Sequence, residues 1–140
     1  MTGLLLDTNV VSELRKSSDR MNPGVRAWAA NLDSTTAYLS AITISELSQW
    51  VVATQRRDPA QGDLLDRWFH SKVLSHYKEH IIPVDTAVAL VAGSLHVPNP
   101  RDYRDCFIAA SAIVHRLTVV TRNTHDFAPM TSDLINPFTP

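Results

Sequence analysis

The sequence predicts an α/β protein, an α/β/α sandwich in which helices cover both faces of a central, mostly parallel sheet. Two observations support this class. Short apolar runs alternate along the chain with longer segments of helical periodicity. The first run, Leu4 to Leu6, is apolar at every position, as in a parallel strand that is buried on both faces. A chain of 140 residues is long enough for one domain with its own core, and we predict a single domain over residues 1–140.

Five segments have the composition of strands. The first is the run at 4–6, and the last is "DLINPF" at 133–138, which is ended by Pro137. Between them we predict strands in "AYLSA" at 37–41, in "HIIPVD" at 80–85 and in the β-branched segment "LTVVT" at 117–121.

The segments between the strands have helical periodicity. Val25, Trp28, Ala29 and Leu32, for example, recur on one face of a helix that Pro23 can open. The same kind of pattern predicts helices at 10–15, 25–31, 43–55, 64–77, 86–95 and 106–115. We predict loops in the proline- or glycine-containing segments at 16–24, 56–63 and 96–105, and in "RNTHDF" at 122–127.

The composition excludes several classes of protein. Thirteen basic and fourteen acidic residues give a formal net charge of −1, so a basic surface for nucleic acid must be local. The four glycines form no phosphate-binding loop. The single cysteine, Cys106, excludes an internal disulfide and fits a reducing compartment. The sequence predicts no signal peptide and no membrane span, so we expect a cytoplasmic protein without a membrane partner.

Four acidic residues follow strands or open helices. Asp7 comes directly after the first strand, and Glu46 lies in the first turn of the helix after the second. Asp105 opens the helix at 106–115, and Asp126 lies in the loop after the strand at 117–121. Because strand ends and the following helix starts share one edge of a parallel sheet, we expect these carboxylates to converge. Such a cluster is costly without a cation, and oxygen ligands select Mg²⁺ or Mn²⁺.

Each acid also has a purely structural explanation. Asp7 could cap the next helix, and "TISE" at 43–46 matches a capping box. Asp102 and Asp105 could cap the helix that follows them, and Asp126 could stabilise its turn. The common edge of the sheet favours a shared site over four separate caps.

Four motifs carry a family resemblance. "LLLDTNVVSEL", "LSAITISEL", "DCFIAASA" and "LTVVTRNTHDF", in this order and spacing, resemble the PIN-domain ribonucleases, specifically the VapC and FitB-like toxins of bacterial toxin–antitoxin pairs. The resemblance runs nearly end to end, through "LINPF" near the C-terminus, and implies a single PIN-like domain. The family often has glycine four residues after its second acid, where this chain has Trp50. The acidic positions of the family fall on Asp7, Glu46, Asp105 and Asp126, and its polar companions on Thr8, Asn9, Thr121 and Asn123.

The resemblance implies metal-dependent hydrolysis of RNA phosphodiester bonds. Asp7, Asp105 and Asp126 are the expected ligands of Mg²⁺ or Mn²⁺, and Glu46 completes the catalytic pocket. The polar companions are expected to orient carboxylates, waters or phosphate oxygens. Phosphates of the RNA could be held by arginines near the acidic edge, which are Arg101, Arg104 and Arg122.

The resemblance also implies partners, and two other classes of protein remain open. The expected partners are an RNA substrate, a cognate antitoxin and a second copy of the chain in a homodimer. The alternatives are a catalytically inactive RNA-binding module and a receiver-like signalling module. The four acids disfavour the first alternative, and the lack of any lysine beyond Lys78 disfavours the second.

Overall fold

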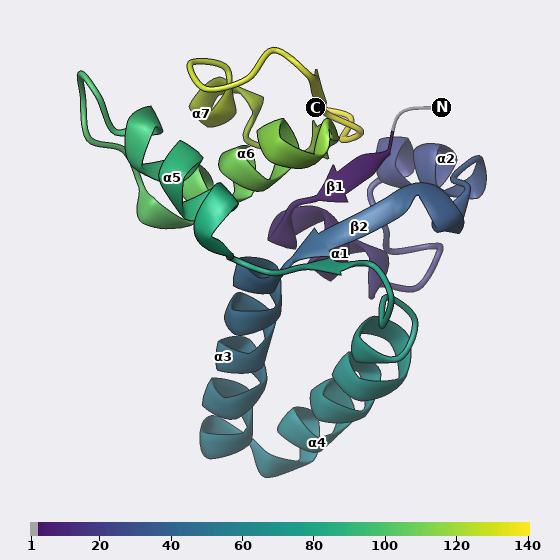
Figure 1. The fold of residues 1–140 in the computed structure, drawn as a ribbon. Helices are drawn as coiled ribbons and strands as arrows, with labels where there is room; N and C mark the ends of the chain where they lie inside the picture. The colour runs from purple at the N-terminus through teal and green to yellow at the C-terminus, as the bar shows by residue number, and fades with distance from the viewer. Residues whose placement is uncertain (1–2) are drawn as a thin grey trace.

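The computed structural model describes residues 3–140 and contains a five-stranded sheet in which every strand pair is parallel (Figure 1). The strand order is β3-β2-β1-β4-β5. The strands are β1 (Leu4–Leu6), β2 (Ala37–Ser40), β3 (Ile81–Ile82), β4 (Thr118–Val120) and β5 (Leu134–Ile135). The predicted parallel sheet is confirmed, with β1 at its centre.

Helices lie on both faces of this sheet. They are α1 (Thr8–Leu14), α2 (Pro23–Ala30), α3 (Ala41–Arg57), α4 (Pro59–Trp68), α5 (Thr86–Leu95), α6 (Tyr103–His115) and α7 (Thr124–Phe127). A short 3₁₀ turn at Ser34–Thr36 precedes β2, and a π-helical segment at Phe69–Leu74 follows α4. None of the helices in the described part of the chain is long and apolar enough to cross a membrane.

Neighbouring residues of the central strands face opposite sides of the sheet, which produces two hydrophobic cores. Leu5 and Val119 pack in one core with residues of α5, α6 and α7, among them Val88, Ile108 and Phe127. Leu6 and Val120 pack in the other core with residues of α1, α3 and α4, among them Val10, Leu47 and Leu65. The central strands are therefore buried on both faces, as their apolar sequences predict.

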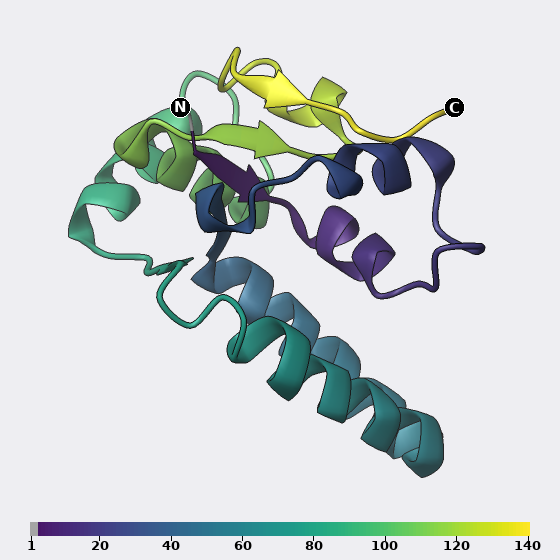
Figure 2. The same ribbon diagram turned by 90° about the vertical axis from the view of Figure 1, so that its right-hand side faces the viewer.

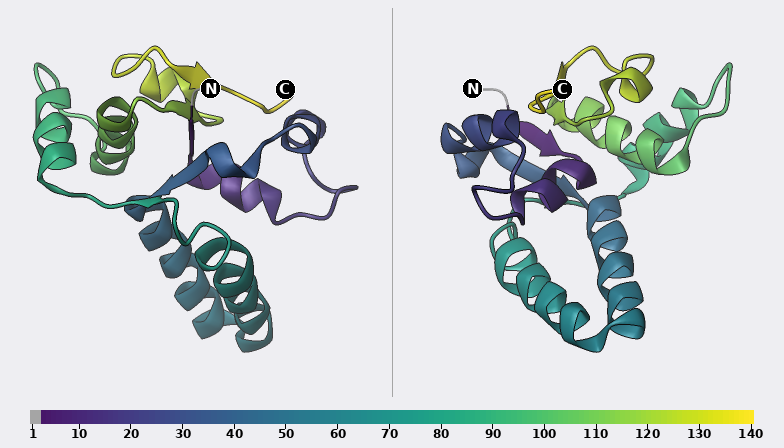
Figure 3. Two further views of the ribbon diagram at one scale, coloured as in Figure 1. Left: turned by 45° about the vertical axis from the view of Figure 1, so that its right-hand side comes forward. Right: turned by 180° about the vertical axis from the view of Figure 1, so that it is seen from behind.

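Helices α3 and α4 run side by side and project from the sheet as an arm, which Figure 2 and Figure 3 show from different sides. The two helices approach closely at Gly62, where an added Cβ atom would lie 2.3 Å from the Cα atom of Gln55. A residue with a side chain would force the two backbones apart there, so glycine sets the spacing of the arm.

The structure corrects three predicted boundaries. The segment at 56–63 is not a loop, because α4 begins at Pro59 and the side chain of Asp58 accepts a hydrogen bond from Gln61 N at 3.2 Å. The helix predicted at 64–77 ends at Trp68 and continues as the π-helical segment. The predicted loop at 122–127 contains the short helix α7.

Candidate active site

Polar residues lie at the ends of β1, β2 and β4, at one edge of the sheet. Asp7 follows β1 directly, and Thr121 follows β4 directly. Ser40 ends β2 and caps α3, which carries Glu46. The convergence predicted from strand ends is confirmed for these residues, because Asp7, Glu46, Asp105 and Asp126 line one hollow of about 460 Å³.

Asp7 is held rigidly at the centre of this edge. Its side chain is 6% exposed. Its Oδ1 atom accepts a hydrogen bond from Thr8 N at 2.8 Å, and its Oδ2 atom accepts from Thr121 Oγ1 at 2.7 Å and from Asn9 Nδ2 at 3.1 Å. Burial raises the pKa of Asp7 above its ordinary value, and these hydrogen bonds oppose the rise. Asp7 is therefore both the N-cap of α1 and a fixed carboxylate facing the hollow.

Two companion residues fix the position of Asp7 by bridging strands and helices. Thr121 is fully buried, and its Oγ1 atom accepts a hydrogen bond from Asn123 N at 3.0 Å while donating to Asp7. The Asn9 side chain donates to Asp7, and its Oδ1 atom accepts from Arg122 N at 3.1 Å. The end of β4 is thereby tied to the start of α1.

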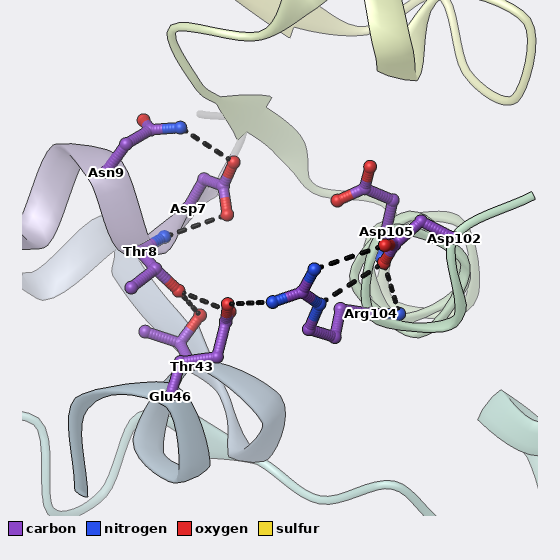
Figure 4. A network of polar contacts seen from close by, with 8 residues as sticks. All are labelled: Asp7, Thr8, Asn9, Thr43, Glu46, Asp102, Arg104 and Asp105. Atoms are coloured by element: carbon purple, nitrogen blue, oxygen red, sulfur yellow. Dashed lines mark hydrogen bonds and ion pairs between the residues drawn. The ribbon is translucent and has the colours of Figure 1, made fainter. Parts of the chain in front are cut away.

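Glu46 reaches the same edge from α3. Thr8 Oγ1 donates a hydrogen bond to Glu46 Oε1 at 2.7 Å, and Thr43 Oγ1 lies 3.1 Å from the same hydroxyl group (Figure 4). The capping-box explanation of 43–46 is wrong, because α3 begins at Ala41 and its N-cap is Ser40. Glu46 consequently lies in the second turn of the helix, with its carboxylate free to face α1 and α6.

The start of α6 supplies a cation and two further carboxylates. Asp102 is the N-cap, and its Oδ1 atom accepts hydrogen bonds from Arg104 N at 2.9 Å and from Asp105 N at 3.3 Å. The Arg104 guanidinium group lies between two acids, with Nη2 3.2 Å from Asp102 Oδ2 and Nη1 3.5 Å from Glu46 Oε2. Its hydrogen bond to Asp102 lowers the pKa of that carboxyl group. The capping explanation is therefore confirmed for Asp102.

Asp105 is the electrostatically strained member of the group. Its pKa is raised from 3.8 to about 6, first by burial and then by repulsion from Asp102, Asp7 and Asp126. Arg104 opposes this rise only in part. The carboxylates are thus close enough to disfavour one another's ionisation, which is the electrostatic property expected of a cation site.

The four carboxylates line one hollow but do not meet at a single point. Within residues 3–140, no three His, Cys, Asp or Glu side chains lie close enough together to hold a metal ion in common. The donor set nevertheless fits a hard divalent cation, because it consists of carboxylate oxygens that repel one another across a solvent-filled hollow. Arg104 is a positively charged side chain among these acids, and its guanidinium group pairs with Glu46 and Asp102.

Two of the three candidate phosphate-binding arginines do not line this hollow. The Arg122 guanidinium carbon lies 5.0 Å from the ring centroid of Phe138, and only its backbone N–H reaches Asn9. Arg101 donates from Nε to Leu95 O at 3.2 Å and lines an adjacent hollow beside α7, which shares Asp102, Asp105 and Asp126 with this one. Arg104 alone of the three lines the hollow that contains Asp7.

Sequence reasoning missed two residues of the site. Ser12 lines the hollow one helical turn after Thr8, a position that the spacing of four residues along α1 could have indicated. Thr43 contacts the Thr8 hydroxyl group, but its sequence context favours the capping explanation instead. Neither position follows a strand directly, so a search limited to strand ends overlooks both.

The site and the fold agree with one known family. A family model described as PIN domain matches residues 4–130. The chain belongs to the PIN domain family. It is 34% identical over 146 residues to the VapC ribonuclease Y4jK of Sinorhizobium fredii, with 98% of this chain and 99% of that protein covered. It is 32% identical over 140 residues to toxin FitB of Neisseria gonorrhoeae, with 96% and 98% covered.

The solved structures give the same assignment. The structure of FitAB bound to an IR36 DNA fragment matches this PIN-domain chain with a TM-score of 0.86 and 30% identity, over 98% of this chain and 96% of that one. The FitAcB structure from Neisseria gonorrhoeae matches with the same TM-score and 32% identity. The resemblance to VapC and FitB-like proteins, inferred from four motifs, is therefore confirmed over nearly the full length of the chain.

Proposed function

We propose that this PIN-domain protein is a Mg²⁺- or Mn²⁺-dependent endoribonuclease and the toxin of a toxin–antitoxin pair. One observation carries the catalytic part of the proposal. Asp7, Glu46, Asp105 and Asp126, which come from four separate parts of the chain, line a single hollow. The relatives add support, since one is named a VapC ribonuclease and another a toxin.

Asp7, Asp105 and Asp126 are the residues that would hold the cation. A bound divalent ion supplies charge neutralisation at the scissile phosphate and lowers the pKa of a coordinated water. The raised pKa of Asp105 supports this set, because Asp7 and Asp126 are among its causes. Among the described residues, no lysine, cysteine or histidine lines this hollow, which favours an oxygen-only site for a hard cation.

The remaining residues position the reacting groups. Thr121 and Asn9 hold Asp7 in one orientation, so that its carboxylate is fixed before substrate binds. Thr8 holds Glu46 in the same way, and Asn123 lines the hollow beside Asp126. Arg104 can exchange its carboxylate partners for a phosphate oxygen, because its guanidinium group is mostly exposed and lies within the hollow.

Cleavage of single-stranded RNA by the purified protein tests the catalytic proposal. We expect cleavage with Mg²⁺ or Mn²⁺, none in excess chelator, and none by Asp7→Asn. Asp63→Asn is the matched control, because Asp63 is an exposed acid of α4 outside the hollow. Undiminished cleavage in chelator contradicts the metal-dependent reaction. Metal-independent RNA binding by the wild type without any cleavage supports the alternative of an inactive RNA-binding module.

The toxin role predicts an antitoxin as partner, and the solved FitAB and FitAcB structures support this expectation. Induced expression of the chain alone should arrest bacterial growth, and expression of Asp7→Asn should not. Co-expression of the antitoxin should restore growth. Equal growth of the wild-type and Asp7→Asn cultures, with both proteins soluble, contradicts the toxin role while leaving the nuclease proposal intact.

A homodimer is the expected assembly, and the exposed apolar side chains near α5 and α6 support it. Leu90, Val97 and Tyr103 are each at least 70% exposed. Apolar side chains exposed on two helices that pack together are one feature of interfaces between subunits. Sedimentation should show a dimer for the wild type and a monomer for Leu90→Glu. A monomeric wild type at micromolar concentration contradicts this assembly.

A further inference from the structure

One face of α1 leads from the acidic hollow to a basic region. Thr8 and Ser12 lie one turn apart on the same side of α1, Arg15 is the C-cap of the helix, and Lys16 follows it. Thr8 and Ser12 line the acidic hollow and also a second hollow of about 420 Å³ between α1 and α3. The second hollow, which we call the α1 groove, is further lined by Glu46, Leu47, Gln49, Trp50 and Ala53.

The far end of the α1 groove is aromatic and basic. The guanidinium carbon of Arg15 lies 5.9 Å from the ring centroid of Trp50 and 5.9 Å from that of Trp68. The two indole rings pack edge to face at 6.1 Å. Beyond them lies a hollow of about 660 Å³, which we call the basic end, lined by Arg15, Lys16, Ser17, Arg20, Leu64 and Trp68.

Two of the three cations that line the basic end, Arg15 and Arg20, have no carboxylate partner among the described residues. Within residues 3–140, Arg15 and Arg20 form no ion pair, and only Lys16 does, with Glu13 Oε1 at 3.0 Å. No acidic side chain lines the basic end. Lys72 adds a further cation in a hollow of about 260 Å³ that shares Arg15 and Trp68 with it.

A neighbouring hollow beside α7 carries more acidic than basic side chains. This hollow of about 440 Å³ is lined by three acids, Asp102, Asp105 and Asp126, and by Arg101 and His125. A polyanion leaving the acidic hollow is therefore repelled on that side and attracted along α1. The charge difference selects one direction for a nucleic-acid strand.

We propose that the α1 groove and the basic end bind the single-stranded RNA segment that flanks the scissile phosphate, with phosphates on Arg15 and Arg20. This inference rests on the proposed ribonuclease function and adds a substrate-binding site to it. Arg15 lies seven residues after Thr8, about 10 Å along the helix axis, which spans about three nucleotides at a stacked spacing of roughly 3.4 Å.

The aromatic residues beside the α1 groove are suited to binding single-stranded RNA. Cation–π contact with two indole rings positions the Arg15 guanidinium group while its N–H groups stay available for a phosphate. Trp50 remains 38% exposed and can stack on a base of any identity. The site therefore binds RNA strongly without reading its sequence.

Binding of a fluorescent single-stranded RNA of twelve nucleotides, measured in chelator, tests the proposal. Each lost phosphate contact should weaken binding about fivefold at 0.1 M salt, and should lower the slope of log K against log salt by about 0.7. We expect about a fivefold loss for Arg20→Gln and about a 25-fold loss for the double variant Arg15→Gln/Arg20→Gln. Lys78→Gln, which removes an exposed cation outside both hollows, should bind as the wild type does.

Cleavage with Mg²⁺ separates a binding role from a general loss of structure. The double variant should show a raised KM for the long RNA with kcat unchanged, and unchanged cleavage of an RNA dinucleotide that is too short to reach the basic end. If the double variant unfolds, the RNA affinity and KM of Arg20→Gln alone test the proposal. This variant should fold, because the Arg20 side chain donates no hydrogen bond within residues 3–140.

The possible outcomes distinguish this inference from the proposed function. Wild-type RNA binding that both arginine variants retain overturns the inference and leaves the ribonuclease function standing. A wild type that neither binds nor cleaves RNA overturns both. Displacement of the RNA by an acidic peptide of equal charge and at equal concentration identifies a protein-binding groove and also overturns the inference.

Discussion

Replacing Asp105 by asparagine should make the ion-free protein more stable at neutral pH. The side chain keeps its shape, but the variant loses a charge that is disfavoured first by burial and then by repulsion from Asp102, Asp7 and Asp126. An aspartate-to-asparagine change at a residue that only caps a helix would instead lower stability by about 0.5 kcal/mol, because asparagine caps as well as aspartate but lacks the charge that the helix N-terminus favours. The sign of the effect therefore distinguishes a member of a carboxylate cluster from a structural cap.

The magnitude follows from the pKa. A rise from 3.8 to about 6 corresponds to roughly 3 kcal/mol, at about 1.4 kcal/mol per pH unit. Solvent screening of this partly exposed carboxylate reduces the penalty to about 1.5 kcal/mol. The variant also loses the favourable contact between a negative charge and the N-terminus of α6, which reduces the gain in stability by about 0.5 kcal/mol. The net gain for Asp105→Asn is therefore about 1 kcal/mol at pH 7.

The pH dependence of the free energy of unfolding gives a second test of whether Asp105→Asn stabilises the protein. The folded protein binds a proton at Asp105 near pH 6, whereas the unfolded chain binds it only near pH 4. Wild-type stability from this group is therefore complete below pH 4 and is lost as the pH rises through 6. The advantage of Asp105→Asn should be absent at pH 4 and complete at pH 7.

Urea denaturation at several pH values measures this difference. The comparison is between wild type, Asp105→Asn and the exposed-acid control Asp63→Asn, all in chelator, so that other titrating groups cancel. A variant that is less stable than the wild type at pH 7, or whose advantage does not change with pH, refutes the account of Asp105.

Two further substitutions test how the site and the chain end are held. Thr121→Val removes the 2.7 Å hydrogen bond to buried Asp7 and should lower the free energy of unfolding, measured by urea denaturation, by about 1–3 kcal/mol. Thr121→Ser keeps the hydroxyl group and should lower it far less. Equal losses for the two variants contradict the assigned bond. Gly24→Ala places a Cβ atom 2.3 Å from Pro137 O, so the C-terminal segment should detach from α2. Hydrogen exchange at the Thr139 amide, which donates to Asn22, should then accelerate. An unchanged exchange rate contradicts this packing.

The sequence predicts the arrangement of the acids because that arrangement depends on local features. A fully apolar run followed at once by Asp7 indicates a buried strand and its end, and parallel strands bring their ends to one edge. Asp102 at the start of α6 is likewise a readable N-cap. These features use only residues that are adjacent in the chain and the geometry of a parallel sheet.

The errors arise where distant segments decide the structure. Asp58 and Pro59 form a helix start that is readable in principle, but a proline and a glycine close together suggest a loop more strongly. Arg122 has a position typical of a phosphate contact, yet packing against Phe138 in the C-terminal segment takes it away from the hollow. The ion pair of Arg104 with Glu46 joins α6 to α3, which no local pattern could reveal.

Binding of Mn²⁺, followed by electron paramagnetic resonance, tests most directly the central claim that the four carboxylates form one cation-dependent nuclease centre. The wild type and Asp63→Asn should bind Mn²⁺ equally, Mg²⁺ should displace it, and Asp105→Asn should bind at least about tenfold more weakly. RNA cleavage measured on the same samples should rise in parallel with the bound ion. Equal Mn²⁺ affinity of wild type and Asp105→Asn, or full RNA cleavage with no ion bound, would contradict the claim.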